Sequence, residues 1–441
     1  MSLIIPANTL AAGGYAVDNS CRFNGTNDSL NLTTGTPTDA KKFTFSTWLK
    51  KCKNGVEQDL MAYNPSGNAE SMIRIDDSDR FVINDRDASD TDVEFFLVSN
   101  AVLRDASAWY NLIVAVDTTD GTNTNRVKMY INGTQVTSLQ TATYPEQNIT
   151  PEISAGSRAV YVGARVTSQF FNGYLAETVF IDGQQLAADS FGEFDSDSGI
   201  WKPIDVSGLT FGTNGFYLDF EASGNLGNDA NGGTDLTESG LAATDQSTDT
   251  CTNNFATMNP LDNFYAAHPF SEGNLNVTTS TSTTSFSTST FGLSKGKWYF
   301  EAKLEVIMGE EGIGVSPVVS TATDDYPGKA TDSVSYKGNN GDIRKSNSNS
   351  SYGDSYAAND IIGVLLNLDD NEIKFSKNGT VQNSGTAVAL TAAASTPNGV
   401  YFPMVGDGSS DSAGRWSLNF GSPSFAISSG NQDGDGYGNF E

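Results

Sequence analysis

The sequence predicts an all-β protein, built as two tandem jelly-roll β-sandwich domains joined by an irregular connector. Short runs in which apolar and polar residues alternate recur along the chain, and clusters of Gly, Asn, Asp and Ser separate them. This pattern is typical of sandwiches and barrels. Helical periodicity is nearly absent, since the best candidate, residues 186–191, spans little more than one turn. The 441 residues are enough for two large cores.

The first half of the chain contains five runs dense in β-branched and aromatic residues, which favour strands. They are residues 43–49, 80–84, 109–117, 127–132 and 174–181. We therefore expect a first sandwich over residues 16–220. Residues 1–15 lack strand alternation and are expected to form an N-terminal arm that docks onto other proteins.

Residues 221–270 are expected to form the connector, because their first part is rich in Gly, Asn and Asp and poor in large apolar residues. A second sandwich is expected over residues 271–421, followed by a tail of residues 422–441. The runs that predict its strands are residues 298–306, 360–368, 372–376, 401–405 and 415–420.

The two halves share a weak similarity in sequence. In each, an apolar strand ending in Asp precedes a strand that ends in Asn-Gly, at Asn132-Gly133 and at Asn378-Gly379. Asn-Gly between alternating strands predicts a hairpin, because both central positions of a type I′ turn need a positive φ. We expect one such hairpin in each half, as in two related sandwiches.

The charge and the rare residues exclude several classes of function. There are 53 Asp and Glu against 25 Lys and Arg, and the net charge is −28. Nucleic acid is not expected as a partner, because phosphate binding depends on clustered Lys and Arg. His268 is the only histidine, and Cys21, Cys52 and Cys251 are widely spaced, so neither a histidine-based nucleophilic site nor a zinc site is expected.

Compartment signals are few. No segment approaches the roughly 18 apolar residues that a membrane helix needs, so no membrane insertion is expected. The few, scattered cysteines indicate folding in a reducing cytoplasm.

Each half resembles a known domain family. The first half contains FSTWLK (45–50), WYNLIVAVD (109–117), VKMYING (127–133) and FNGYLAETVFIDGQQL (171–186). Together these runs resemble the concanavalin A-like, laminin-G-like jelly roll. The second half contains, in order, GKWYFE (296–301), GIGV (312–315), NDIIGVLLNLD (359–369), KFSKNG (374–379), YFP (401–403) and NFG (419–421). This series resembles the SPRY domain, also a two-sheet sandwich.

The combination of segments resembles virion proteins of tailed bacteriophages, especially marine ones. It rests on IPANTLAAGGY (5–15), FIDGQ (180–184) and ATDQSTDTCTNNFATMNPL (243–261), together with the SPRY-like end. The resemblance implies a non-enzymatic tail-fibre or receptor-binding component of the virion, which mediates host adsorption through lectin-like domains. It also implies other virion proteins as partners, a host surface glycan or receptor as ligand, and a homo-oligomer, with a trimer favoured.

Two other functions stay open. One is a head decoration or fibre, or a tail-collar protein, that binds no host glycan. The other is a polysaccharide depolymerase, which would need a close pair of carboxylates. The nearest approach to such a pair, Glu177 and Asp182, lacks the E-x-D-x-x-E spacing.

Acid-rich loops in the first half are candidates for sugar binding, because carboxylates and amides match pairs of hydroxyl groups. They span residues 74–79 and 84–92, and the candidate ligands are Asp76, Asp77, Asp85 and Asp87. Solvated loop tips are the alternative.

In the second half, a long polar loop carries Tyr336, Tyr352 and Tyr356. Tyrosines within Gly, Ser and Asn form adaptable contact surfaces, so these three are candidate ligand contacts. Ordinary loop anchors are the alternative.

The tail contains one candidate metal site. Asn431, Asp433 and Asp435 follow the one-three-five spacing of a calcium loop, with Gly436 at position six and Asn439 further on. The bidentate Glu would fall one position after Glu441, and no flanking helices are evident. Apart from this calcium, no cofactor is expected.

Overall fold

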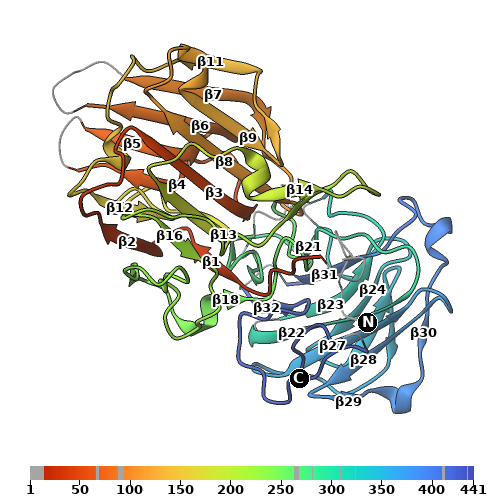
Figure 1. Ribbon diagram of the computed structural model, residues 1–441. Coiled ribbons are helices and arrows are strands. Elements are labelled where there is room, and N and C mark those ends of the chain that lie inside the picture. The colour runs from red at the N-terminus through yellow and green to blue at the C-terminus, as the bar shows by residue number, and fades with distance from the viewer. Residues whose placement is uncertain are drawn as a thin grey trace. The chain divides into compact units, whose positions relative to one another are not determined.

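The computed structural model describes residues 14–65, 69–87, 94–262, 268–280, 282–307, 309–322, 324–409, 413–434 and 436–441. Within these ranges the regular structure is β-strand, apart from short 3-10 turns of three residues each, which confirms the all-β prediction. The chain forms two compact units, one ending at Asn254 and the other beginning at Phe255 (Figure 1). Among the described residues, no helix has the length and apolarity needed to cross a membrane.

The first unit is a sandwich of two antiparallel sheets. The strand order in its first sheet is β10-β9-β8-β3-β13-β1-β18, and β16 also pairs with β13. These strands are β1 (Ser20–Asn24), β3 (Lys42–Lys51), β8 (Trp109–Asp117), β9 (Val127–Ile131), β10 (Thr134–Gln135), β13 (Asn172–Asp182), β16 (Phe216–Leu218) and β18 (Gln246–Ser247).

The second sheet of this unit has the order β11-β7-β6-β5-β4-β12-β2-β17. Its strands are β2 (Ser29–Thr33), β4 (Gln58–Tyr63), β5 (Glu70–Ile75), β6 (Arg80–Arg86), β7 (Phe95–Val102), β11 (Leu139–Thr143), β12 (Ala159–Val162) and β17 (Thr237–Ser239). Alternate residues of both sheets, such as Phe43, Phe45, Ile73 and Ile83, form one buried apolar core.

A second apolar cluster involves other residues of the first sheet. It includes Trp48 of β3, Ile113 of β8 and Val179 of β13. Chain segments outside this sheet complete the cluster, among them β15 (Trp201–Pro203), which pairs with β14 (Gly192–Phe194). The central strands β3 and β13 are therefore buried along nearly their whole length.

The second unit is also a sandwich. One sheet has the order β19-β20-β32-β22-β27-β28-β29, with β30 on β28, and the other has the order β21-β31-β23-β24-β25-β26. The first consists of β19 (Phe270–Ser271), β20 (Asn276–Thr278), β22 (Lys297–Val306), β27 (Ile361–Asn367), β28 (Glu372–Lys377), β29 (Thr380–Val381), β30 (Val388–Ala389) and β32 (Arg415–Asn419). The second consists of β21 (Ser285–Thr288), β23 (Glu311–Ser316), β24 (Val334–Lys337), β25 (Asp342–Lys345), β26 (Ser348–Ser351) and β31 (Phe402–Asp407).

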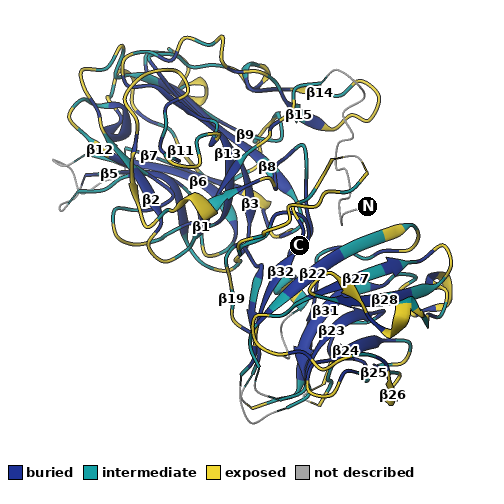
Figure 2. Ribbon diagram, turned by 90° about the horizontal axis from the view of Figure 1, so that it is seen from below, coloured by how far each residue is buried: buried dark blue, intermediate teal, exposed yellow. Residues whose placement is uncertain are grey.

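Figure 2 shows the buried residues, in dark blue, running along the strands of both sandwiches, while exposed residues gather in the loops. The core of the second unit includes Phe300, Ile313, Val364 and Trp416, which come from both of its sheets.

The two predicted Asn-Gly hairpins are present. Asn132 and Gly133 have φ values of 47° and 74°, and Asn378 and Gly379 have φ values of 47° and 76°. Residues on either side of each turn pair with each other, as Ile131 does with Thr134. Both positions of each turn are therefore left-handed, as a type I′ turn requires.

The expected connector over residues 221–270 is divided between the two units, and its first part, expected to be a connector rather than core, packs into the first core. Leu226 and Leu236 are buried in the first core, and β17 and β18 extend the two sheets of the first unit. This segment packs despite its composition because its acids satisfy backbone groups. Asp229, for example, accepts the N–H groups of Tyr217 and Asn231 at 2.9 and 3.0 Å.

Two other segments singled out in the sequence are the helix candidate and the N-terminal arm. Residues 186–191 contain only the 3-10 turn at Ala188–Ser190. All of the expected N-terminal arm except Gly14 and Tyr15 lies outside the described residues.

Candidate functional site

An open pocket of about 540 Å³ lies in the first sandwich, beside the β9–β10 hairpin and the β14–β15 pair. This volume falls in the range of about 300–1,000 Å³ that is usual for small-ligand sites. Its aromatic and acidic lining residues are Tyr130, Asp189, Glu193, Phe194 and Trp201.

Trp201 is held rigidly in this pocket. Its indole Nε1 donates a hydrogen bond to Oδ1 of Asn111 at 3.1 Å. Gly133, in the Asn-Gly turn, lies so close to the indole that a Cβ atom there would overlap the ring. The hairpin turn and the tryptophan therefore fit together only because Gly133 has no side chain.

Two more aromatic rings border the pocket. Phe194 is 54% exposed, and its ring meets Trp201 edge-on, with 4.9 Å between the centroids. Tyr130 is half-buried, and burial together with the charge of Asp189 raises the pKa of its phenol above the usual value. The phenol therefore stays protonated at neutral pH and serves as both donor and acceptor.

The two carboxylates of the pocket differ. Glu193 forms an ion pair with Lys202 at 3.1 Å. Asp189 is exposed and has no hydrogen bond or ion pair with the described part of the chain. An open carboxylate beside an exposed aromatic ring offers acceptors for hydroxyl pairs and an apolar face for C–H groups.

The acidic loops predicted from the sequence do not form one site. Asp76 and Asp77 lie in the turn before β6, whereas Asp87 follows the end of that strand. Seven residues of extended strand separate them by roughly 20 Å. Oδ1 of Asp76 accepts the N–H groups of Ser78 and Arg80 at 2.9 and 2.8 Å, so this carboxylate stabilises the hairpin.

Asp85 was predicted wrongly as a ligand contact. It is only 1% exposed, and its carboxylate accepts the N–H of Glu152 at 2.8 Å. Burial raises the pKa of Asp85 to about 8. The alternation of β6 explains the error, since Asp85 lies on the face that Phe81 and Ile83 bury.

The opposite face of strands β4, β5 and β6 carries a network of ion pairs, which the sequence analysis did not predict. Arg165 binds Glu57, and its Nε lies 2.8 Å from Oδ2 of Asp59. Arg74 lies 3.4 Å from Glu57, and burial raises the pKa of Asp59 to about 6. The alternation of ESMIRI (70–75) already placed Glu70 and Arg74 together on this face.

The three candidate tyrosines of the second half are core residues, so their predicted contact role was wrong. Tyr336, Tyr352 and Tyr356 are all buried. The ring of Tyr336 lies 5.7 Å from that of Tyr352 and 5.2 Å from that of Tyr356, and the Tyr356 hydroxyl donates to the Tyr336 carbonyl at 2.8 Å. Tyr336 lies in β24, and β25 and β26 make up much of the predicted loop, so the three rings fill the core beneath these strands.

The predicted calcium segment forms a hairpin-like loop. Asn431 and Phe440 exchange two backbone hydrogen bonds, of 2.8 and 2.9 Å. Oδ1 of Asp433 accepts the N–H of Tyr437 at 2.9 Å, and the Asn439 carbonyl accepts a bond from a side-chain amide. Asp435 lies outside the described residues. Across the described chain, no group of three or more His, Cys, Asp or Glu could hold a metal ion.

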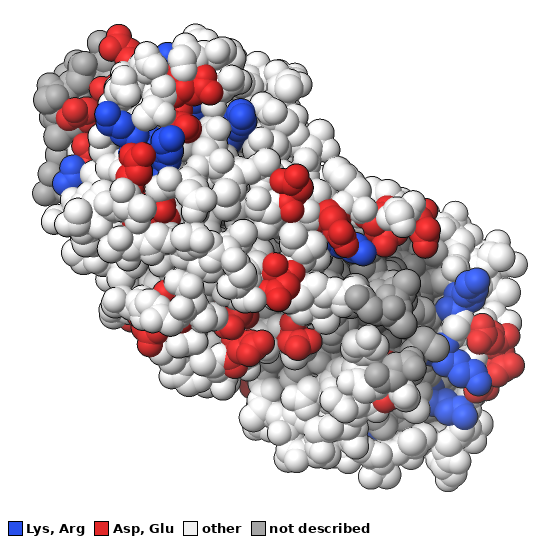
Figure 3. Space-filling model, viewed as in Figure 1, with Lys and Arg blue, Asp and Glu red and all other residues white. Residues whose placement is uncertain are grey.

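Figure 3 shows acidic side chains scattered over the visible face of both units, with basic ones fewer and mostly beside them. A small group of basic side chains gathers at the right edge of the second unit on that face.

Two domain families are found in the chain. Residues 24–189 match the concanavalin A-like lectin/glucanases superfamily, and residues 297–417 match the SPRY domain. The pocket described above thus lies partly within and partly just after the lectin-like match. The comparison with curated proteins gave no match.

Several solved structures are similar to parts of the chain. A putative carbohydrate binding protein from Bacteroides ovatus is 13% identical, with 51% of this chain and 58% of that chain covered and a TM-score of 0.35. A human SPRY domain is 21% identical, with 33% and 91% covered and a TM-score of 0.26. Stonustoxin is 19% identical, with 37% and 27% covered and a TM-score of 0.29. All three TM-scores are below 0.5, so no function is transferred from these structures.

Proposed function

We propose that this chain binds glycans through the pocket of its first sandwich. One observation carries the proposal: the exposed ring of Phe194, the phenol of Tyr130 and the open carboxylate of Asp189 border a single pocket. Sugars present C–H patches to aromatic rings and hydroxyl groups to carboxylates, so this chemistry suits a sugar ring. The match of residues 24–189 to a superfamily that includes lectins supports the assignment.

We further propose that the chain serves as a tail-fibre or receptor-binding component of a tailed-phage virion, and that it adsorbs to host surface glycans. The support is the resemblance of residues 5–15, 180–184 and 243–261 to phage virion proteins. Residues 1–15 would dock onto other virion proteins, and the assembly would be a trimer. Deleting residues 1–15 should then abolish incorporation into particles while both sandwiches still fold.

The surroundings of the carboxylates favour binding over catalysis. Glu57 and Asp59 are both held by Arg165. Glu177 is buried in a β-bulge with φ of 46°, where it accepts hydrogen bonds from Tyr217 at 2.8 and 2.9 Å. Burial raises its pKa to about 7, but little of it is open to a substrate. The release of reducing ends from host polysaccharide by the purified chain would support a depolymerase instead.

The binding test compares two exposed apolar residues near one hairpin. Phe194→Ala should weaken binding of the full chain to host-envelope polysaccharide at least tenfold, measured by biolayer interferometry. Ile200→Ala is the control, because Ile200 is 46% exposed but does not line the pocket. Equal binding by wild type, Phe194→Ala and Ile200→Ala would contradict the proposed site.

The virion role has its own test. Immunogold labelling of intact particles should place the chain on the tail, and the purified chain should block adsorption of phage to cells. Labelling on the capsid, with no block of adsorption, would favour a head decoration or other purely structural role.

A further inference from the structure

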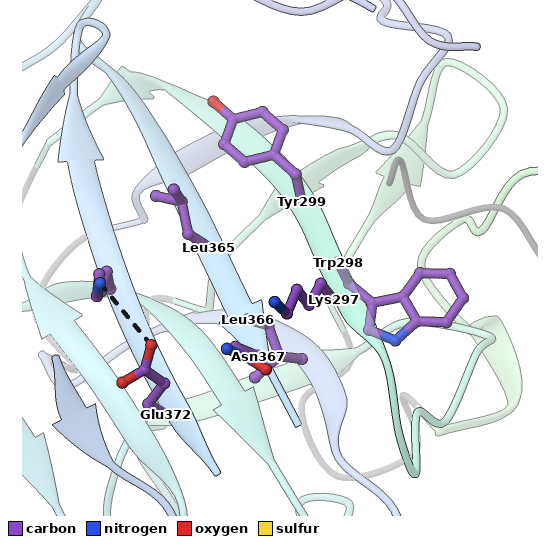
Figure 4. A pocket seen from close by; sticks show the side chains of 8 residues that line it. Lys297, Trp298, Tyr299, Leu365, Leu366, Asn367 and Glu372 are labelled. Atoms are coloured by element: carbon purple, nitrogen blue, oxygen red, sulfur yellow. Dashed lines mark ion pairs between the residues drawn. The ribbon is translucent and has the colours of Figure 1, made fainter. Parts of the chain in front are cut away.

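A second pocket lies on the second sandwich, over β22, β27 and β28 (Figure 4). Strand register places Lys297, Asn367 and Glu372 side by side in one row across these strands. The next row contains Tyr299, Leu365 and Lys374 in the same order. β27 therefore forms the floor of the pocket, and β22 and β28 form its two sides.

The pocket is small and has one apolar part. Its volume is about 290 Å³, at the lower end of the usual range for small ligands, which suits a single sugar ring. Tyr299 and Leu365, both half-buried, supply the apolar surface. Figure 4 shows the side chains of both residues above the strands that carry them.

One of the two lysines in the pocket has no carboxylate partner among the described residues. Lys374 faces Glu372 at 3.8 Å, the ion pair dashed in Figure 4. Lys297 is exposed, and its ammonium group forms no ion pair or hydrogen bond with the described residues. Its side chain extends across the pocket toward Asn367 (Figure 4). The lining itself contains two lysines and one carboxylate, and Asp370 and Glu301 lie beside it, where they bind Asn367 and Tyr299. The pocket therefore offers an anion the single ammonium of Lys297 rather than a net positive charge.

The walls of the pocket are fixed before any ligand binds. The Tyr299 hydroxyl donates to Oε2 of Glu301 at 2.8 Å, and the ring of Phe440 meets Tyr299 edge-on at 5.0 Å. A Cβ atom at Gly363 would lie 2.5 Å from that hydroxyl, so the ring sits close over the strand. Nδ2 of Asn367 donates to Asp370 at 2.7 Å. Side chains held in this way lose little conformational freedom on binding.

We propose that this pocket binds an acidic sugar, of the uronic acid class. Its carboxylate pairs with Lys297, its ring lies against Leu365 and Tyr299, and its hydroxyl groups face Asn367 and Glu372. The inference rests on the proposed function in that it takes the chain to be a glycan binder, but it concerns another unit and another class of sugar. No residue is shared with the pocket around Phe194.

The test uses a galacturonic acid hexamer and its methyl ester, in which each carboxylate is neutralised by an added methyl group. Calorimetry with the full chain should show binding of the acid and at least tenfold weaker binding of the ester. Lys297→Met, which keeps the aliphatic stem, should weaken binding of the acid at least tenfold, and Lys297→Arg should restore most of it. Lys303→Met is the control, because Lys303 lies on the same strand but outside the pocket and pairs with Glu305 at 3.2 Å.

Four results would overturn the proposal. Equal losses for Lys297→Met and Lys303→Met would mean diffuse attraction, and equal binding of acid and ester would mean that the charge is not recognised. No binding of the acid at millimolar concentration would exclude the site. A loss caused by Phe194→Ala instead would assign the acid to the first pocket. In each case binding of host polysaccharide that depends on Phe194 would leave the proposed function standing.

Discussion

The two sandwiches have similar cores and different outer surfaces on their central strands. In the first, β3 and β13 are buried along nearly their whole length, because a second apolar cluster, which includes Trp48 and Val179, packs on the first sheet. In the second, β22 and β28 alternate between buried and half-exposed residues. Added chain segments thus produce an aromatic pocket beside the first sheet. On the second sheet the tail covers only part of the outer surface, where Phe440 packs against Tyr299, and a shallow polar pocket remains beside it.

The largest expected loss of stability comes from removing the buried contacts of Lys50. These contacts hold Asp249 and Asn254, in the segment that covers the first sheet. Lys50, fully buried, lies 2.8 Å from both Oδ2 of Asp249 and Oδ1 of Asn254. Lys50→Met leaves the Asp249 carboxylate buried without its cation, which costs about 3–5 kcal/mol. Urea unfolding should show the transition of the first sandwich shifted to lower urea.

The control is the half-exposed pair of Lys42 and Asp117, 3.1 Å apart. Lys42→Met should change stability by less than about 1 kcal/mol. If both variants shifted the urea transition equally, Lys50 would not be what holds this segment against the first sheet.

Alanine substitutions in the two Asn-Gly turns should give the next largest loss of stability. Gly133 and Gly379 have φ values of 74° and 76°, so alanine at either position costs about 1–2 kcal/mol for the left-handed backbone. Around Gly379 nothing lies within 4 Å of an added Cβ, but at Gly133 the atom would overlap the Trp201 ring. Gly133→Ala should therefore destabilise its sandwich more than Gly379→Ala, and it alone should weaken glycan binding. Equal stability losses would show that the Trp201 contact is unimportant.

The pH dependence of the first sandwich should follow its buried carboxyls, chiefly Asp85, together with Glu177 and Asp59, whose pKa values are raised to about 7 and about 6. Because burial raises the pKa of Asp85 to about 8, the folded state keeps a proton that the unfolded state releases above about pH 4. Unfolding therefore releases a proton between pH 4 and 8, and the free energy of unfolding falls as pH rises through that window. Asp85→Asn should flatten this part of the profile in urea unfolding measured from pH 4 to 8. An unchanged slope would mean that Asp85 is ionised in the folded chain.

Most of the fold was predictable, because strands and tight turns are encoded locally. Alternation located the main strands, and Asn-Gly at 132–133 and 378–379 located both hairpins. The second apolar cluster was not predictable in this way, because the residues that complete it, such as Trp201 and Phe211, are distant in sequence from Trp48. The same long-range packing brought Leu226 and Leu236 into the first core.

The candidate sites were harder to predict, because residue type alone does not say which way a side chain points. Asp85 and Tyr336 have suitable chemistry for ligand binding but face the core. The alternation of KWYFEA around Tyr299 and of VLLN around Leu365 could have placed Lys297, Tyr299 and Leu365 on one face, but only strand pairing shows that they meet.

The smallest loss of stability is expected from substitutions at Asp76 and Asp77, in the acidic turn between β5 and β6 that the sequence analysis offered for sugar binding. Asp77 is exposed in the turn between β5 and β6, so Asp77→Ala should change stability by no more than about 0.5 kcal/mol. Asp76→Ala is the matched variant, and should cost about 1 kcal/mol because two backbone hydrogen bonds are lost. Neither should alter glycan binding, since the pocket at Phe194 is lined by other residues. If Asp77→Ala weakened binding as much as Phe194→Ala, the sugar would bind at the hairpin tip, and the aromatic pocket beside the covered sheet would lose its assigned role.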